Sequence, residues 1–459
     1  MELARNHGLS FGLEFGAKKN AQGLTLQAWK PSIRRAAIPA KKEEEEMNGL
    51  KGMTAVATLL IAPAAMAQNA VTEWNAIAIT EARASAAPGS ATPGGTGVYV
   101  AYMQLAVYNA VNAVDGRFEP YKYSLTAPAG ASADAAAVEA AYRTLRYLLP
   151  DRVTSLDAEY ASALAAIPGG QDKTNGQSVG LASANALIAL RAGDGRGANV
   201  PYTFPSSPVP GVWILTPGAT APQTPWLGQM RPFTFDDPAQ FLPEPPLDLL
   251  SKAWANDYNQ VKALGAINST VRTPAQTEIA LFWTEHTTAQ YGRLLRRTAT
   301  DLNLSLADTA RLFAMAYAAH ADSLIGCYNA KYIFSFWRPV TAIRNGGIDD
   351  NPDTIADPNW TPLTVTPPHP EYPSAHSCLT GSLAEIFKIY FGSPTLHISI
   401  DSTVTGTTHD YKNVHEWQTE VEFARIYVGF HYHHSVVQGG LLGRKVAHYV
   451  MQNYFQPVR

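Results

Sequence analysis

Apolar residues recur every three or four positions along most of this chain, which is the spacing of one face of a helix. The pattern runs from residue 71 to about 190, is clearest at 99–111 and 136–149, and resumes from about 249 to 332. Few stretches alternate apolar and polar residues as a half-buried strand does. The sequence therefore predicts an all-α fold built from helical bundles.

Two stretches interrupt the helical pattern. Residues 193 to about 245 are rich in Gly, Pro, Thr and Ser, and a second irregular stretch spans residues 345–373. This composition is typical of loops, so we expect long Pro/Gly-rich segments that cross the fold or cover a substrate site. Two final helices are expected after Pro373. No boundary after residue 68 is sharp enough to divide the chain into independent domains.

The first 67 residues differ in character from the rest. Residues 1–46 have no sustained hydrophobic period and carry a dense charge run, so we interpret them as a disordered or mis-assigned N-terminal extension. Residues 47–67 combine a short positive region, an apolar stretch and an Ala-x-Ala cleavage site, which is the pattern of a secretory signal peptide. We therefore expect a natural start at Met47 or Met53, and a secreted or periplasmic mature domain of residues 68–459.

Composition and charge narrow the function classes. Apolar residues make up 46% of the chain and charged residues 16%, which indicates a globular protein. The net charge of −3 gives no bias toward nucleic acid or anionic membranes. The chain has two cysteines, Cys327 and Cys378. This number excludes a disulfide framework and a cysteine-rich metal site and leaves one disulfide open. No stretch after residue 68 approaches about 18 uninterrupted apolar residues, so no transmembrane segment is expected there.

Residues 369–377, HPEYPSAHS, lead directly into a predicted helix that Gly392 should end. Its apolar positions are Leu379, Leu383, Ile386, Phe387 and Tyr390. Ser374, Ala375 and His376 then lie at the helix N-terminus, where free N–H groups and the helix dipole favour an anion. A hydroxyl, two backbone amides and an imidazole suit an oxyanion. A capped helix with a surface histidine is the alternative that this stretch alone leaves open.

A pair of cations precedes this segment. Lys331 and Arg338 are seven residues apart, two helical turns, so we expect both to project from one helix face. Pro339 predicts a helix end near Arg338. Two cations on one face repel each other, and apolar and aromatic residues surround them. An anion between them would offset that repulsion.

A third segment follows at residues 423–435. Arg425 carries a planar fork that matches an oxyanion. Gly429 should break the chain after it and leave His431 in a turn. Nine of the 12 histidines lie at or after residue 369, which favours proton chemistry or ligation in this part of the chain. His433 and His434 have no assigned role.

The last predicted helix runs from Ser435 to about Asn453. Ser435 and Gln438 have the spacing of a capping box, so Ser435 is expected to cap this helix. Gly439 and Gly443 form a small-residue stripe suited to close packing against another helix. The C-terminal half, about residues 249–459, is therefore expected to carry the anion site.

These three segments, KYIFSFWRP, PSAH and ARIYVGFH, resemble a known three-part signature, K-x6-RP, PSGH and SR-x5-H-x3-D. That signature belongs to the superfamily of vanadium-dependent haloperoxidases and type 2 phosphatidic acid phosphatases. The resemblance extends through most of the chain after residue 68, but only the three segments are specific. It implies a helical fold of the haloperoxidase and acid phosphatase type.

The resemblance also implies a role for each motif residue. Lys331, Arg338 and Arg425 would neutralise the equatorial oxygens of vanadate, or of phosphate in the same site. Ser374 would donate through its hydroxyl and Ala375 through its backbone amide. Fixed positive charge around a trigonal-bipyramidal oxyanion fits these assignments.

The two motif histidines would act at the poles of the oxyanion. His431 would be the metal ligand, bound to vanadium, or the nucleophile that takes up phosphate. His376 would be the acid–base on the opposite side. In the peroxidase reaction Lys331 would polarise the bound peroxide.

The chain departs from the signature at three positions. Ala375 replaces a glycine, and Ala424 replaces the serine before the arginine. Ser435 replaces the terminal aspartate, whose family role is to orient the axial histidine. Because a serine polarises an imidazole less than a carboxylate does, His431 is expected to be a weaker nucleophile, which counts more against phosphatase activity than against vanadate binding.

Two features favour the soluble haloperoxidase-like branch. His369, seven residues before His376, stands where algal bromoperoxidases carry a histidine and the fungal chloroperoxidase type a phenylalanine. Tyr328 stands where the chloroperoxidase type carries a tryptophan, so the halide side matches neither type fully. Both are candidates for the halide side of the site. The lipid phosphatases of the superfamily are multi-span membrane proteins, and no such spans are expected here.

The expected function is a vanadate-dependent peroxidase that oxidises halide, bromide above the others, with hydrogen peroxide to hypohalous acid. One alternative is a soluble secreted acid phosphatase that hydrolyses a phosphate ester through a phosphohistidine intermediate. A second is a catalytically silent anion-binding protein. Glu285 or His286 is expected to support an arginine of the site.

Overall fold

The computed structural model describes residues 69–458, so the extension and signal peptide predicted for residues 1–67 lie outside the described residues. Within the described part there are thirteen α-helices, three short 3-10 helices and one two-stranded hairpin, which confirms the all-α prediction. No helix among residues 69–458 is long and apolar enough to cross a membrane.

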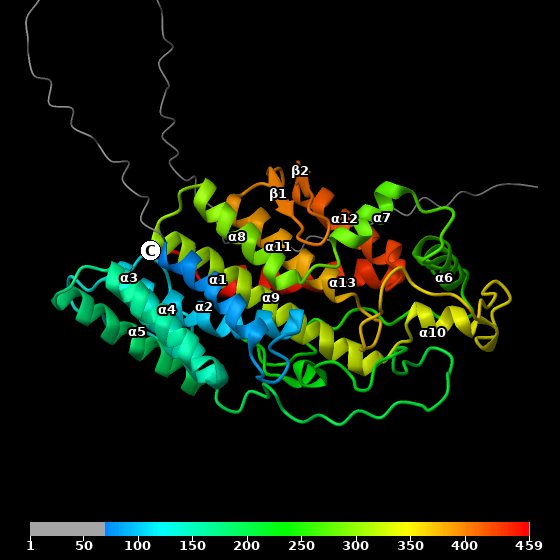
Figure 1. Ribbon diagram of the computed structural model, residues 1–459, viewed down its shortest axis with the longest axis horizontal. Coiled ribbons are helices and arrows are strands. Elements are labelled where there is room, and N and C mark those ends of the chain that lie inside the picture. Colours follow the sequence, from blue (N-terminus) through cyan, green and yellow to red (C-terminus); the bar gives the residue numbers. More distant parts are fainter. Residues whose placement is uncertain (1–68, 459) are drawn as a thin grey trace, which may run out of the picture. The chain divides into compact units, whose positions relative to one another are not determined.

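The first five helices carry the predicted pattern of residues 71–190. They are α1 (Ala70–Ala84), α2 (Pro93–Asp115), α3 (Ala133–Leu148), α4 (Val153–Ala166) and α5 (Gln171–Leu190), with the 3-10 turn η1 (Pro150–Arg152) between α3 and α4. In α2, the Thr92 side chain caps the first turn and Gly116, at a φ of 77°, ends the helix. α2 packs against α3, α5 and α9, and α3, α4 and α5 lie together at one end (Figure 1).

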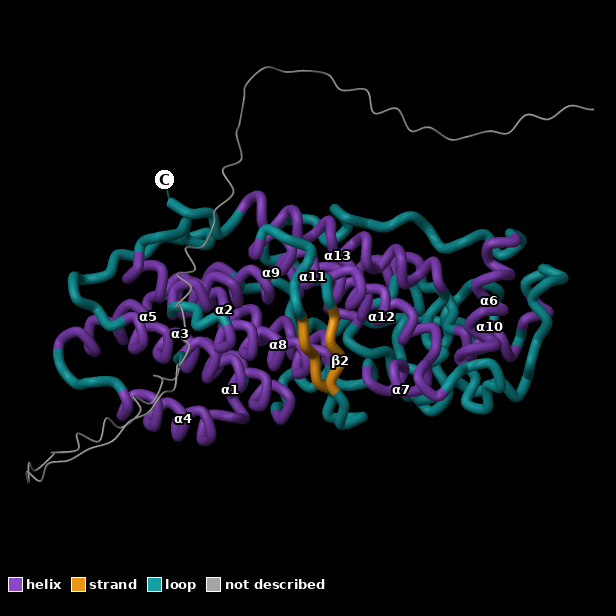
Figure 2. The backbone as a smooth tube through the Cα atoms, turned by 90° about the horizontal axis from the view of Figure 1, so that it is seen from above, coloured by secondary structure: helices purple, strands orange, loops and turns teal. Residues whose placement is uncertain are grey.

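The remaining helices carry the predicted site. They are α6 (Lys252–Gly265), α7 (Pro274–Phe282), α8 (Thr287–Asp301), α9 (Leu306–Phe334), α10 (Pro339–Arg344), α11 (Ala375–Phe391), α12 (Val414–Tyr427) and α13 (His433–Asn453), with the 3-10 turn η3 (Gly346–Ile348) after α10. α6, α7 and α10 lie at the end away from α3 and α5 (Figures 1 and 2).

The helix α9 lies at the centre of the described residues. Ser305 caps its first turn, and most of its side chains are buried. It packs against α2, from the N-terminal half of the chain, and against α11 and α13, from the C-terminal half. Because Lys331 lies in the last turn of α9, the same helix that joins the two halves delivers a motif residue to the site.

A long irregular segment, residues 191–251, covers the end of α9. Among its residues only η2 (Pro225–Gln229) is helical, and this turn packs on α9. The segment pairs with the chain just after α9, where Trp213 N donates to Ser335 O at 2.7 Å and Trp337 N donates to Gly211 O at 3.2 Å. The predicted irregular stretch is thereby confirmed, and it holds the residues that connect Lys331 to Arg338.

The helices α11 and α13 pack closely through small residues, as predicted. A Cβ atom on Gly439 would lie 2.6 Å from Ser374 O, and one on Gly443 would lie 2.0 Å from Cys378 O. Cys378 and Cys327 are buried free thiols, so the disulfide that the sequence left open does not form. The glycine stripe sets the distance between α13 and the start of α11, where Ser374 lies.

The predicted capping box at Ser435 is wrong. α13 begins at His433, with Tyr432 as the preceding residue and no side-chain cap from it. Asp257 of α6 instead accepts from His434 N at 2.7 Å. The carboxylate that satisfies this helix N-terminus is supplied from another helix, which the local sequence could not indicate.

The C-terminal part also differs from the prediction of two final helices. Three helices follow Pro373, and a hairpin of β1 (Ile398–Asp401) and β2 (Thr408–Tyr411) lies between α11 and α12. The strands pair antiparallel, with Ile398 opposite Tyr411, and lie beside α8 and α12 (Figure 2). Each strand has four residues, which is too short to give a distinct alternating pattern.

Replacing Gly443 by alanine should destabilise the protein by about 3 kcal/mol, because its new methyl group would collide with a backbone carbonyl of α11. Urea unfolding followed by circular dichroism measures this. Gly347→Ala is the matched control, since nothing lies within 4 Å of its Cβ position; a change within about 0.5 kcal/mol is expected there. Equal stability of the two variants would contradict the close packing.

Candidate active site

Lys331 and Arg338 come from two different elements. Ser335 adopts a left-handed φ of 45° and its N–H closes on Lys331 O at 2.8 Å, which ends α9. Arg338 immediately precedes α10, whose first residue is Pro339. The prediction that both cations share one helix face is therefore wrong, because the turn at Ser335 separates them.

Lys331 holds the segment that leads into α11. Its buried Nζ donates to Pro370 O at 3.0 Å and to Glu371 O at 2.9 Å, and also to Pro373 O. Burial, helped by the nearby Arg338 guanidinium, lowers the pKa of Lys331 to about 8. Since an ammonium has three N–H donors, Lys331 would reach an oxyanion only by exchanging one of these carbonyls.

Arg338 joins the two loops that carry His369 and His431. Its Nε donates to His369 O at 2.9 Å, and Nη2 lies 2.9 Å from His369 Nδ1. Its Nη1 donates to Phe430 O at 3.0 Å and lies 3.3 Å from His431 Nε2. Burial lowers the pKa of Arg338, and the nearby Glu371 carboxylate opposes that shift. One fully buried guanidinium therefore positions both imidazoles.

The position of His431 follows from the glycine break predicted before it. Gly429 has a φ of 83°, and a Cβ atom there would lie 2.7 Å from Gly265 O. The tight turn lets the N–H groups of Phe430 and His431 both donate to Arg425 O, at 3.1 and 3.2 Å. This arrangement confirms that His431 lies in a turn between α12 and α13.

The His431 ring meets a carboxylate that the sequence did not single out. Its Nδ1 lies 2.8 Å from Glu371 Oε1, and both side chains are buried. Burial and then the Arg338 charge hold the pKa of His431 well below its ordinary value. Burial raises the pKa of Glu371 to about 7, with Lys331 and Arg338 opposing that shift.

Arg425 and His376 each have a buried nitrogen with no partner. Arg425 Nη1 donates to Trp283 O at 2.8 Å, but its Nε has no hydrogen-bond partner among the described residues. The His376 ring is partly exposed, yet its Nε2 atom is buried and equally unpaired. Desolvation lowers the pKa of both groups. Buried polar atoms without partners are rare, so a polar ligand is expected beside these two.

A cavity of about 440 Å³ brings many of the predicted residues together. Those that line it are Tyr328, His369, Ala375, His376, Arg425 and His431. Lys331, Arg338 and Ser374 are fully buried and do not line it. Lys331 and Arg338 therefore lie behind the lining of the cavity, which includes three histidines and Arg425.

Ser374 begins α11 as predicted and is tied to α13. Its side chain accepts from Ser377 N at 3.5 Å, and its backbone N donates to Ser435 O at 3.2 Å. Gly392, at a φ of 68°, ends the helix where the sequence placed the cap. The helix N-terminus carrying Ala375 and His376 therefore faces the cavity that both residues line.

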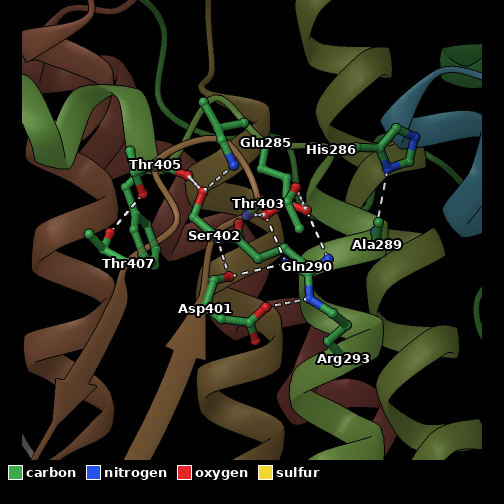
Figure 3. Close-up of polar contacts among 12 residues, drawn as sticks. Glu285, His286, Ala289, Gln290, Arg293, Asp401, Ser402, Thr403, Thr405 and Thr407 are labelled. Atoms are coloured by element: carbon green, nitrogen blue, oxygen red, sulfur yellow. Dashed lines mark hydrogen bonds and ion pairs between the residues drawn. The ribbon is translucent and has the colours of Figure 1, made fainter.

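Neither Glu285 nor His286 supports an arginine of the site, so that prediction is wrong. Both oxygens of Glu285 accept from Arg293 at 2.8 Å, and the Thr403 N–H and hydroxyl also donate to them (Figure 3). His286 turns away and its ring accepts from Ala289 N at 3.4 Å, at the start of α8 (Figure 3). Glu285 thus links Arg293 of α8 to the hairpin, whereas His286 Nε2 lies 3.2 Å from the Thr96 hydroxyl of α2.

The donor set of the cavity fits a bound oxyanion. Arg425, His376 and the N-terminus of α11 face the cavity, and two of their nitrogens are unpaired. The buried cations Lys331 and Arg338 lie behind its lining. A tetrahedral or trigonal-bipyramidal oxyanion would satisfy those donors and offset the mutual repulsion of the cations. Vanadate and phosphate share this chemistry.

Comparison with known proteins identifies the motif-bearing part of the chain. Residues 311–459 match the family model described as the VCPO second helical-bundle domain, and this span holds all three motifs. Residues 311–459 therefore belong to the vanadium haloperoxidase superfamily. The vanadium chloroperoxidase of Curvularia inaequalis is 32% identical over 148 residues, which are 28% of this chain and 24% of that protein. The match thus spans about a quarter of the curated relative.

Solved structures show that the fold extends well beyond the matched motifs. A bacterial vanadium-dependent iodoperoxidase superimposes with a TM-score of 0.70 at 24% identity, covering 84% of this chain and 97% of that one. A holo-type bacterial vanadium-dependent chloroperoxidase superimposes with a TM-score of 0.65 at 16% identity, covering 79% and 92%. At these identities the likeness establishes the fold of the described residues.

Within this superfamily, the chain's three departures lie in different surroundings. Ala424 is buried in the core on α12, and Ala375 lines the cavity. Ser435 is buried, and its hydroxyl lies 3.5 Å from His431 Nδ1, at the limit of a hydrogen bond. The closest carboxylate contact of that nitrogen is with Glu371 instead.

Anion affinity should fall as pH rises through about 8. Lys331 has a pKa lowered to about 8, so its ammonium is charged below that pH and neutral above it. Phosphate remains a dianion over most of this range, so weaker binding would report the lysine, by up to about tenfold per pH unit. Calorimetric phosphate titrations measure this. Lys331→Met should bind weakly at every pH and lack the fall; an unchanged fall in that variant would contradict the assignment.

Proposed function

We propose that this protein is a vanadate-dependent peroxidase that oxidises halide with hydrogen peroxide to hypohalous acid. The observation that supports it most is the pair of unpaired buried nitrogens, Arg425 Nε and His376 Nε2, beside a cavity that His431 also lines. A cavity of about 440 Å³ has room for an oxyanion and small co-substrates. The relationship to vanadium haloperoxidases over residues 311–459 supports the same reaction class.

The residues fit a bound vanadate, with His431 as its nitrogen ligand. Arg338 and Arg425 would offset its negative charge, with Lys331 joining them after exchange of a carbonyl, and Ser374 and the Ala375 amide would donate to its oxygens. When bound, vanadate would supply the Lewis acidity that activates hydrogen peroxide toward halide. These assignments are proposals that follow the family motif.

The chain's own residues would manage protons and charge. His376 is neutral at ordinary pH because its pKa is lowered, so its unpaired Nε2 can accept a proton from hydrogen peroxide and return it to product. Lys331 would keep positive charge near the reacting oxygens at neutral pH. Buried surroundings strengthen both effects, because the local dielectric is low.

His369 supports bromide as the preferred halide. It lines the cavity, and its ring centroid lies 5.3 Å from that of Tyr328. Arg338 donates toward His369 Nδ1 at 2.9 Å, so this side of the cavity stays polar and cationic. A polar, cationic wall suits a halide anion, and the place of His369, where algal bromoperoxidases carry a histidine, favours bromide among the halides.

A phosphatase is the second candidate, and one contact favours it. The sequence counted Ser435 against a nucleophilic histidine, but Glu371 Oε1 lies 2.8 Å from His431 Nδ1 and offers the carboxylate that Ser435 lacks. A phosphohistidine route, with His376 protonating the leaving oxygen, therefore stays chemically feasible. A silent anion-binding protein is the third reading.

Paired assays on the full chain, purified without phosphate, distinguish the three. Bromination of a phenolic dye with hydrogen peroxide, dependent on added vanadate, supports the proposal; iodide and chloride run in parallel give the halide order. Hydrolysis of p-nitrophenyl phosphate that vanadate inhibits, without bromination, assigns the site to phosphate chemistry. Inactivity in both, with retained phosphate binding, leaves the silent anion-binding protein.

We further propose that residues 47–67 direct export to the periplasm or outside the cell. Their pattern of a positive start, an apolar stretch and a small-residue cleavage site supports this. Amino-terminal sequencing of exported protein is the test. A start at Gln68 supports export, and an intact Met1 rejects it.

A further inference from the structure

Glu371 is a buried carboxylate whose hydrogen bonds are all made by one oxygen, Oε1. Its side chain is fully buried, and Oε1 lies 2.8 Å from His431 Nδ1 and accepts from Tyr432 N at 3.2 Å. Its Oε2 has no partner among the described residues. A carboxylate is costly to bury unless it makes such contacts, so this placement calls for a role at His431.

The backbone of Glu371 is fixed from two sides. Its N–H donates to Phe336 O at 2.9 Å, and its carbonyl accepts from Lys331 Nζ at 2.9 Å. Both partners belong to the first motif segment, so the carboxylate is held in place by the same residues that precede Arg338. Glu371 therefore approaches His431 from a rigid support.

The two contacts of the His431 ring agree on one tautomer. A carboxylate oxygen beside Nδ1 accepts a hydrogen bond, so the ring proton belongs on Nδ1. The Arg338 guanidinium beside Nε2, at 3.3 Å, is a donor, so Nε2 must present its lone pair. The 3.3 Å contact is long for a hydrogen bond, and it is the one that a ligand at Nε2 would displace.

Ser435 cannot supply the same support. Its hydroxyl lies 3.5 Å from His431 Nδ1, whereas Glu371 Oε1 lies 0.7 Å closer, at 2.8 Å. A hydroxyl carries no charge and can donate as well as accept, so it fixes neither the tautomer nor the basicity of the ring. The position that carries an aspartate in the motif is therefore not the one that holds the ring in this chain.

We propose that Glu371 is the positioning residue of His431: it holds the proton on Nδ1 and presents Nε2, in place of a carboxylate at Ser435. In the motif the carboxylate stands four residues after the histidine, within the third segment. In this chain it stands 60 residues before His431, just ahead of the second segment. A ligand histidine whose other nitrogen meets a carboxylate is oriented and made more basic. The part of this inference that concerns vanadate binding at Nε2 rests on the proposed function, and the part that concerns the His431 tautomer does not.

Three variants of the full chain test the inference: Glu371→Ala, Glu371→Gln and the double variant Glu371→Ala with Ser435→Asp. Calorimetric titration with orthovanadate gives affinity. Nitrogen NMR of protein labelled in histidine gives the tautomer of His431, with the signal assigned by its loss in His431→Ala. The NMR readout needs no vanadate, so it separates the hold on the ring from the proposed function.

The expected result is a graded loss with rescue. Glu371→Ala should weaken vanadate binding by about 10- to 100-fold and remove the preference for a proton on Nδ1. Glu371→Gln, whose amide oxygen still accepts from Nδ1, should keep the tautomer and lose less than about tenfold. The double variant should recover the tautomer and at least about tenfold of the affinity, because it returns a carboxylate beside the same nitrogen.

Other outcomes overturn the inference. An unchanged His431 tautomer in Glu371→Ala rejects it, and so does a changed tautomer with wild-type affinity. If Glu371→Ala does not fold, the double variant decides: failure to restore the Nδ1 proton rejects the proposal. Wild-type protein that shows the Nδ1 proton, loses it in Glu371→Ala and yet binds no vanadate supports the hold on His431 and refutes the proposed function instead.

Discussion

His431→Ala should lose vanadate affinity by more than about 100-fold and show no vanadate-dependent halide oxidation. Loss of a partner that only orients a metal ligand costs about 10- to 100-fold, so loss of the ligand itself should cost more. The substitution removes the only group of the site proposed to bond the metal directly. Equilibrium dialysis against vanadate, together with bromination assays, measures both losses.

His433→Ala is the matched control for this prediction. His433 lies two residues later, is exposed and has no role in the site. Its loss should leave affinity and rate within about twofold, as expected for a surface substitution. Equal losses in the two variants would show that the segment as a whole matters and that His431 is not a specific ligand.

Arg338→Lys should be the most damaging conservative change in the site. One guanidinium reaches His369, Phe430 and His431 together, and a lysine ammonium has no planar fork to do this. We expect a loss of about 2–4 kcal/mol in the free energy of unfolding, because buried carbonyls lose charged donors. Vanadate affinity should fall by at least about tenfold, since two imidazoles lose their support.

Denaturant unfolding and vanadate binding on the same preparation check this prediction. Arg344→Lys is a suitable control, since Arg344 lies on the short α10 after Arg338 and its contacts are with Trp360 O and Thr361 rather than with the site. It should keep wild-type vanadate affinity. If Arg338→Lys bound vanadate as tightly as wild type, Arg338 would be a structural cation alone.

The helical fold was predictable because the signals that start, continue and end a helix lie within a few residues of one another in the sequence. Apolar spacing, the Thr92 and Ser305 caps and the left-handed glycines Gly116 and Gly392 are all local signals, and the structure follows them. The left-handed turn that follows α9 was not predictable in the same way. It depends on a non-glycine residue, Ser335, in the left-handed region, which tertiary contacts with the loop at Trp213 hold in place.

The motif residues were found from the sequence, but their connections were not. Motif order identified Lys331, Arg338 and His431 without any knowledge of distance. Glu371 was visible within HPEYPSAHS, yet its partner His431 is 60 residues away, and no local pattern joins them. The same limit explains the misassigned cap at Ser435, because the true partner, Asp257, comes from α6.

Lys331 shows a different limit of sequence reasoning. The motif predicts that Lys331 points at an oxyanion. In the structure its ammonium instead donates to three backbone carbonyls of residues 370–373. Its structural role, holding the approach to α11 in place, was hidden because backbone acceptors leave no signature in the sequence. Loop support is thus the role of Lys331 that the structure shows, and anion binding is the role proposed for it.

A single titration tests the central claim, that His431 and the surrounding cations form a vanadate site used for halide oxidation. Vanadate is added stepwise to the full chain purified without phosphate, and bound vanadate and the rate of bromide oxidation are followed together. We expect both to saturate in parallel at a single vanadate per chain, and both to vanish in His431→Ala. Binding that saturates without oxidation of any halide, while the vanadate-free protein hydrolyses a phosphate ester, would contradict it.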